Sequence, residues 1–143
     1  MSGYAATGAV ERGGEAVVTT LVSRIAVDGS AGRSETVPGP ADLLTAAFAA
    51  CVLKNVERFS RILPFSYERA EIRVEATRQD APPRISARRY QLTVVSDEPA
   101  HWVDLLHRNI RRIGTIYNTL AAVADVTGDL HVVPIGTPRK DEP

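Results

Sequence analysis

From residue 40 to residue 63 the chain reads PADLLTAAFAACVLKNVERFSRIL. Pro40 suits the first turn of a helix, where its missing N–H has no intrahelical partner to lose, and Asp42 adds a negative charge favourable to the helix dipole. From Leu43 to Leu53 every residue except Thr45 is apolar. Because this run is too short to span a bilayer, it predicts a helix that is buried on every side.

The second half of this helix is amphipathic. Val56, Phe59 and the pair Ile62/Leu63 continue an apolar stripe between charged residues. The helix is expected to end at about Leu63, because the residue before Pro64 disfavours the helical conformation.

The residues before the helix predict an N-terminal β-hairpin. Residues 3–10 have the pattern of a short strand, Arg12-Gly13-Gly14 that of a turn, and residues 15–28 are rich in Val, Thr and Ile. The loop that follows contains Pro38-Gly39-Pro40.

The residues after the helix predict a second antiparallel hairpin. Residues 70–77 alternate between apolar and polar side chains, residues 80–83 form a turn, and Tyr90, Leu92 and Val94 share one face of the strand 85–96. The alternation is typical of a sheet with one solvated face.

The C-terminal third predicts a second helix, which begins near Pro99 and ends before Gly114. A short helix over 117–125 and a last strand from Gly128 through residues 130–135 complete the order. The expected fold class is therefore α+β, with two hairpins and a terminal strand around a long central helix and a second helix.

Composition restricts the function classes. The chain has 143 residues, 17 Lys+Arg against 17 Asp+Glu, and one cysteine. We expect one domain over residues 1–135, followed by a flexible tail over residues 136–143. Zero net charge argues against nucleic-acid binding, and one cysteine excludes internal disulfides and thiolate zinc sites. Without a signal-peptide pattern, we expect a soluble cytoplasmic protein that binds no membrane.

The apolar helix also bears on assembly. A helix that is apolar on all sides needs cover on all sides, and six strands with one other helix give little of it. A second copy of the chain supplies the rest, so we expect an obligate homodimer. The alternative is a monomer whose sheet curls around the helix.

Cys51 is the first candidate for chemistry. A free cysteine on an Ala-rich helix often acts only as a small apolar side chain. A reactive thiol instead needs a positive group near its thiolate, and Cys51 lies too far along the helix for the dipole to serve. Arg12 or Arg33 would have to approach it.

Metal and cofactor signals are weak. His101 and His107 are six residues apart, which places them on different helix faces, and His131 has no acidic or thiol neighbour in sequence. No glycine-rich loop joins a strand to a helix as in a nucleotide site. We therefore expect no metal and no cofactor.

Two motifs carry a resemblance to a known family. PADLLTAAFAAC, residues 40–51, resembles the first-cysteine motif of the OsmC/Ohr family (osmotically inducible protein C and organic hydroperoxide resistance protein). GTIYNTL, residues 114–120, is similar to the second-cysteine motif, with Gly114 in the place of the cysteine. Arg12-Gly13-Gly14 resembles the hairpin turn that carries the family's activating arginine.

The resemblance implies an intertwined homodimer with active sites at the subunit interface. It also implies a thiol peroxidase that reduces organic hydroperoxides, with Cys51 as the peroxidatic nucleophile and Arg12 stabilising its thiolate. Gly114 cannot act as a resolving residue, so an external thiol or dithiol would have to recycle the enzyme. The acidic residue of the hydroperoxide-resistance branch is replaced by Ala41, with Asp42 one position on.

Two other functions remain open. A non-catalytic relative could bind a small apolar ligand at the dimer interface, which the missing second cysteine favours. A thiol redox sensor would act through a partner protein.

Overall fold

The computed structural model describes residues 3–138, and the contacts within the chain divide it into two compact units, one ending at Leu44 and the other beginning at Thr45. The last residues of the expected tail, 139–143, lie outside the described part.

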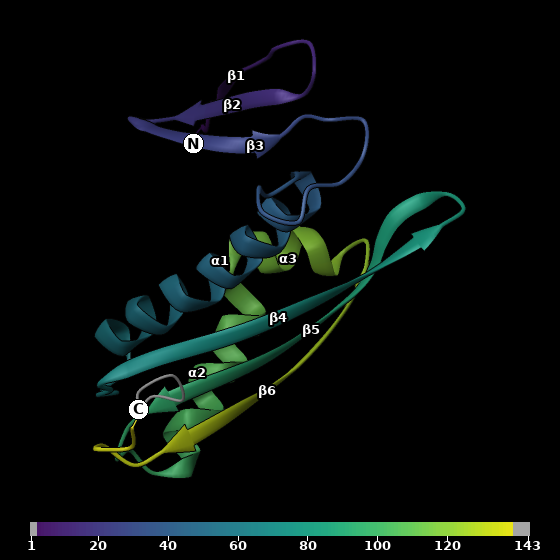
Figure 1. Cartoon of the computed structure of the whole chain (residues 1–143). Coiled ribbons are helices and arrows are strands. Elements are labelled where there is room, and N and C mark those ends of the chain that lie inside the picture. Colours follow the sequence, from purple (N-terminus) through teal and green to yellow (C-terminus); the bar gives the residue numbers. More distant parts are fainter. Residues whose placement is uncertain (1–2, 139–143) are drawn as a thin grey trace. The chain divides into compact units, whose positions relative to one another are not determined.

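The first unit contains a three-stranded antiparallel sheet of β1 (Thr7–Val10), β2 (Glu15–Thr20) and β3 (Ser23–Asp28) in the order β1-β2-β3 (Figure 1). The prediction of one strand over 15–28 is wrong. Thr20 pairs with Ser23, so Leu21 and Val22 form a two-residue hairpin loop. Leu21 has a φ of 53°, and it is 95% exposed. The loop was missed because leucine and valine are not typical of turns that require a positive φ.

The second unit begins within α1 (Pro40–Ile62), whose predicted bounds are confirmed to within one residue. It continues with β4 (Arg69–Asp80), β5 (Pro83–Val95), α2 (Ala100–Ile113), α3 (Thr115–Ala121) and β6 (Asp125–Val133).

The C-terminal elements differ from the sequence prediction. The expected helix over 117–125 is instead α3, and residue 125 already belongs to β6. The last strand begins three residues before Gly128 and ends before residue 135. The mixed α+β class itself is confirmed.

The second sheet has the order β4-β5-β6, with β4 antiparallel and β6 parallel to the central β5. Tyr90, Leu92 and Val94 are fully buried on one face of β5, as their alternation predicts, while Arg89 and Gln91, on either side of Tyr90, are exposed. The core lies between that face and the three helices. Its buried members are Phe48, Val52, Val56, Phe59, Phe65, Tyr90, Leu92, Val94, Val103, Leu106, Ile110, Tyr117 and Leu120.

The prediction that α1 is buried on every side is wrong for a single chain. Its buried residues are Phe48, Val52, Asn55, Val56 and Phe59, which recur at helical spacing along one face. Ala47 and Ala50 on another face are exposed. One chain therefore covers only part of the apolar helix surface.

No helix in the described part of the chain is both long and apolar enough to cross a membrane.

Candidate functional site

Cys51 lies in the middle of α1 and is half-buried against the core. One turn further on, the side chain of Asn55 folds back over it. Asn55 Nδ2 donates to the Cys51 carbonyl oxygen at 2.8 Å and lies 3.6 Å from Cys51 Sγ. Asn55 is only 7% exposed. An amide N–H thus points at the sulfur in a region of limited solvent access, where it can stabilise negative charge on the thiolate.

Gly114 lies against the same sulfur. It joins α2 to α3, and a Cβ built on it would be 3.3 Å from Cys51 Sγ, 3.0 Å from Tyr117 Cβ and 3.1 Å from the Ile110 oxygen. Its φ of −61° is one that any residue adopts. Glycine is therefore favoured here by the close approach of its neighbours and not by backbone conformation. The two positions that carry the OsmC/Ohr resemblance meet in space.

Aromatic rings line the adjacent core. Phe48, three residues before Cys51, has its ring centroid 5.8 Å from that of Tyr90 and 5.4 Å from that of Tyr117. The rings of Tyr90 and Tyr117 meet edge to face at 6.2 Å. These contacts fix α3, and with it the segment that begins at Gly114, against α1.

Tyr90 is hydrogen-bonded to His107 on α2. The Tyr90 hydroxyl meets His107 Nε2, and the two rings are T-shaped. Burial raises the pKa of Tyr90, with a further contribution from Tyr117. Burial also lowers the pKa of His107, and the positive charge of Arg111 lowers it further. Both groups are therefore neutral at neutral pH, and the tautomer of His107 sets which of the two donates.

Gly128 on β6 makes room for this pair. It pairs with Tyr90 in the β5–β6 register, and a Cβ at Gly128 would lie 2.2 Å from the Tyr90 ring. The ring therefore covers the bare glycine backbone.

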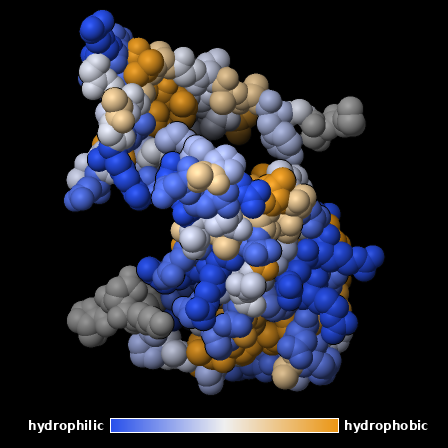
Figure 2. Space-filling view, turned by 90° about the vertical axis from the view of Figure 1, so that its right-hand side faces the viewer, coloured by the Kyte–Doolittle hydropathy of each residue, from blue (hydrophilic) through white to orange (hydrophobic). Residues whose placement is uncertain are grey.

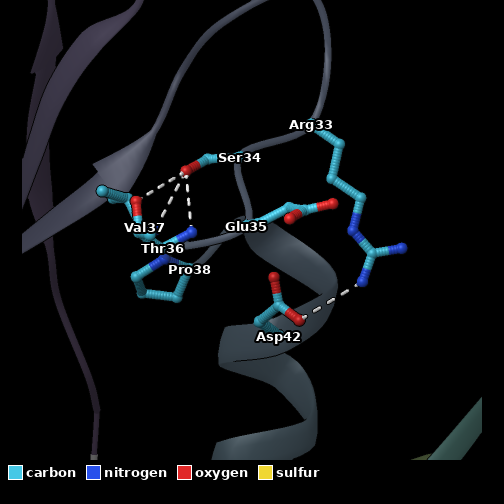
Figure 3. A pocket seen from close by; sticks show the side chains of 7 residues that line it. All are labelled: Arg33, Ser34, Glu35, Thr36, Val37, Pro38 and Asp42. Atoms are coloured by element: carbon cyan, nitrogen blue, oxygen red, sulfur yellow. Dashed lines mark hydrogen bonds and ion pairs between the residues drawn. The ribbon is translucent and has the colours of Figure 1, made fainter.

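Arg33 and Asp42 meet in the first unit. Arg33 Nη2 lies 3.9 Å from Asp42 Oδ1, and both residues line a surface pocket of about 560 Å³ with residues 34–38 (Figure 3). Asp42 Oδ2 also accepts a hydrogen bond from the Gly39 N–H at 3.0 Å, as expected of an acidic residue at a helix start. Both side chains are well exposed, so this ion pair contributes little to stability.

Ser34 shapes the pocket wall. Its hydroxyl accepts hydrogen bonds from the N–H groups of Thr36 and Val37, and its own N–H donates to Asp28 Oδ2 at 2.7 Å. The Ser30 hydroxyl and the Ser34 and Ser30 N–H groups lower the pKa of Asp28, because each bond favours the carboxylate. Asp28 thus holds the loop that presents Arg33.

Arg12 lies in the β1–β2 turn. The Gly14 N–H donates to the Glu11 oxygen at 3.0 Å, and Gly13 and Gly14 have φ values of 107° and 103°. Only glycine adopts such values readily, so the Arg-Gly-Gly sequence accounts for the turn. Arg12 belongs to the first unit and Cys51 to the second, and activation of Cys51 by Arg12 stays a prediction.

Asn55 and the Tyr90–His107 pair were both missed in our sequence analysis. An asparagine one turn after a cysteine was a detectable signal, because residues i and i+4 share a helix face. The bond between Tyr90 and His107 joins residues 17 apart and had no local signal. In the described residues, no group of three or more His, Cys, Asp or Glu side chains is placed to hold a metal.

Comparison with known proteins places the fold. Neither a family model nor a curated protein matches the sequence. Solved structures do match over nearly the whole chain. The OsmC-like protein from Mycoplasma pneumoniae is 14% identical with a TM-score of 0.84, over 92% of this chain and 98% of that one.

Two organic hydroperoxide resistance proteins match as well. The protein from Legionella pneumophila is 16% identical with a TM-score of 0.73, over 92% of this chain and 98% of that one. OhrB of Bacillus subtilis is also 16% identical, with a TM-score of 0.64, over 90% of this chain and 98% of its own. The mixed α+β fold, with two small sheets and three helices, is therefore an OsmC-like fold.

Proposed function

We propose that this protein is a thiol peroxidase that reduces organic hydroperoxides through Cys51. The proposal rests on the contacts around Cys51 Sγ. The sulfur is half-buried, faces the Asn55 amide at 3.6 Å, and lies beside the Gly114 backbone. Structural neighbours described as organic hydroperoxide resistance proteins support the same chemistry.

The reaction follows from a single thiolate. Cys51 Sγ attacks the terminal oxygen of the hydroperoxide, so that an S–O bond forms and the O–O bond breaks. The sulfur is oxidised to sulfenic acid, and the other oxygen leaves as the alcohol after taking up a proton. We assign to Arg12 the positive charge that stabilises the thiolate and orients the peroxide.

Recycling needs thiols from outside the chain, because its only cysteine is the nucleophile. One external thiol condenses with the sulfenic acid to a mixed disulfide and releases water. A second thiol then releases Cys51 and leaves as the reductant's disulfide. A cytoplasmic location, which we also propose, supplies such reduced thiols.

We further propose that the chain acts as a homodimer. No residue from 3 to 44 is buried, and large apolar side chains are exposed, such as Val10 in β1 (62%) and Val22 in the β2–β3 loop (98%). Figure 2 shows such apolar patches at the surface. A small sheet without a buried face is marginal on its own, and a second copy would cover both this sheet and the exposed alanines of α1. Sedimentation equilibrium tests this proposal, and a monomer at micromolar concentration would contradict it.

The proposed activity is tested by hydroperoxide consumption with monothiol and dithiol reductants compared. Cys51→Ser is expected to abolish turnover, and Arg12→Ala to slow it by about two orders of magnitude, if it removes the charge that stabilises the thiolate. Arg24→Ala is the matched control, since Arg24 is another exposed arginine of the same sheet. If Cys51→Ser retains the full cellular role, the protein is a ligand-binding relative instead.

A further inference from the structure

Three arginines gather at the end of α2. Arg108, Arg111 and Arg112 are spaced i, i+3 and i+4, and therefore share one face of the helix. All three line a pocket of about 400 Å³. Its other walls come from α3 and the start of β6, through Tyr117, Ala121, Ala124, Asp125 and Val126.

These cations have few carboxylates near them among the described residues. Within the described residues, none of the three forms an ion pair within 4 Å with a carboxylate. Among the described residues that line the pocket, Asp125 alone is acidic. Like charges at i, i+4 repel, so three guanidinium groups around one concave surface lower the stability of the fold. An anion in the pocket would offset this repulsion.

A fourth arginine lies beside the pocket wall. Arg88 on β5 is only 2% exposed, and its Nε has no hydrogen-bond partner in the described part of the chain. Arg88 pairs in the β5–β6 register with Val126, which lines the pocket. Burial lowers the pKa of Arg88, because desolvation disfavours its charged form. An uncompensated buried charge is costly, and nearby negative charge would reduce that cost.

We propose that the pocket formed by Arg108, Arg111, Arg112 and Tyr117 binds the oxyanion group of a small molecule, a carboxylate or a phosphate. Guanidinium groups match both anions through paired N–H donors, and the volume suits a small ligand rather than a polymer. The site goes beyond the proposed peroxidase chemistry and does not depend on it. It is nonetheless close to the thiol, because Tyr117 Cβ and Cys51 Sγ both lie within 3.3 Å of the Cβ position at Gly114.

The test is isothermal titration of the full chain with inorganic phosphate and with citrate at constant ionic strength, with chloride as the competing ion. We expect saturable binding of at least one of the two anions. Phosphate without citrate would identify a phosphate ligand, and citrate without phosphate a carboxylate ligand. The double substitution Arg111→Gln/Arg112→Gln is expected to weaken binding at least tenfold. Arg84→Gln, next to the β4–β5 turn and outside the pocket lining, removes one charge and is expected to leave affinity within twofold.

Two further variants keep the result decisive. Arg108→Gln alone removes only one of the three guanidinium groups and serves if the double variant fails to fold, as judged by circular dichroism. Cys51→Ser is expected to bind the anion as the wild type does. Anion binding is thus tested separately from the peroxidase proposal, which can fail without affecting it. The proposal is overturned if neither anion binds, or if Arg84→Gln weakens binding as much as the pocket variants, since that would indicate only diffuse charge attraction.

Discussion

Cys51 Sγ lies 3.3 Å from the position that a Cβ would occupy at Gly114. This places the lone thiol of α1 directly against the α2–α3 junction, where a second sulfur would be within bonding reach. The absence of a side chain at 114 is thus a chemical feature of the site as well as a packing one.

Replacing Gly114 by cysteine is expected to allow a disulfide with Cys51. The φ of −61° accepts a side chain, although Tyr117 Cβ and the Ile110 oxygen must shift by a few tenths of an ångström. Intact mass after mild oxidation is expected to show the loss of two hydrogens in Gly114→Cys. Gly114→Ala is the control for crowding alone. Two free thiols in folded, oxidised Gly114→Cys would contradict the geometry.

Asn55 is expected to act as a positioning residue for the thiol. Without the Asn55 amide, the sulfur loses a nearby donor in a poorly solvated site. We therefore expect Asn55→Ala to slow the reaction of Cys51 with hydroperoxide by about tenfold, which is the effect of roughly one charge-assisted hydrogen bond. Stopped-flow measurement of thiol oxidation gives this rate.

Asn109 supplies the matched control. Its Nδ2 donates to the Leu105 oxygen at 3.0 Å, the same bond to the preceding turn but with no thiol involved. Asn109→Ala is therefore expected to leave the rate unchanged. If both variants react equally slowly, the effect of Asn55 belongs to helix stability and not to the sulfur.

The lowered pKa of His107 predicts that the folded protein loses stability in mild acid. Its pKa is lowered in the folded protein, so its contribution is complete above the ordinary value of 6.5 and is lost as pH falls through the folded value. One titrating group can change the free energy of unfolding by at most about 1.4 kcal/mol per pH unit. The His107 ring is only partly buried, so we expect a smaller change. Urea unfolding between pH 7.5 and 5 is expected to show a shallower decline in His107→Gln than in wild type. An unchanged decline would show that the histidine is not responsible, and the exposed His101→Gln serves as control.

Gly128 is expected to tolerate no side chain. Alanine would overlap the Tyr90 ring, and overpacking of this kind costs about 1–3 kcal/mol of the free energy of unfolding. The measurement is denaturant unfolding. Combining Gly128→Ala with Tyr90→Leu is expected to cost less than the sum of the two single changes, because the smaller side chain relieves the overlap. Strict additivity would contradict the proposed contact.

The sequence predicted those parts of the fold that depend on local pattern. Apolar spacing and Pro40 placed α1, and strict alternation placed Tyr90, Leu92 and Val94 in the core. The sequence-based prediction failed where turn residues were absent or where the pairing residues lie far apart in the chain. The loop at Leu21 lacks turn residues, and β6 could not be assigned as a parallel neighbour of β5 from its own residues.

Some features of the candidate site could likewise be predicted from the sequence, and others could not. Cys51 was a candidate as the lone thiol and Gly114 was selected by resemblance, but their contact is a property of how α1 meets the α2–α3 junction. The position of Asn55 beside Cys51 could have been predicted from helical periodicity alone. Arg88 could not be recognised as a buried cation, because its neighbour across the sheet, Val126, is 38 residues away in the chain.

The central claim is that Cys51 is a peroxidatic thiol, and intact mass spectrometry after one equivalent of an organic hydroperoxide tests it most directly. We predict the gain of one oxygen on Cys51, trapped as the adduct of a sulfenic-acid reagent, with one alcohol released per chain and a rate far above that of the urea-unfolded protein. A folded chain that gains no oxygen, or gains it no faster than the unfolded one, would contradict the claim.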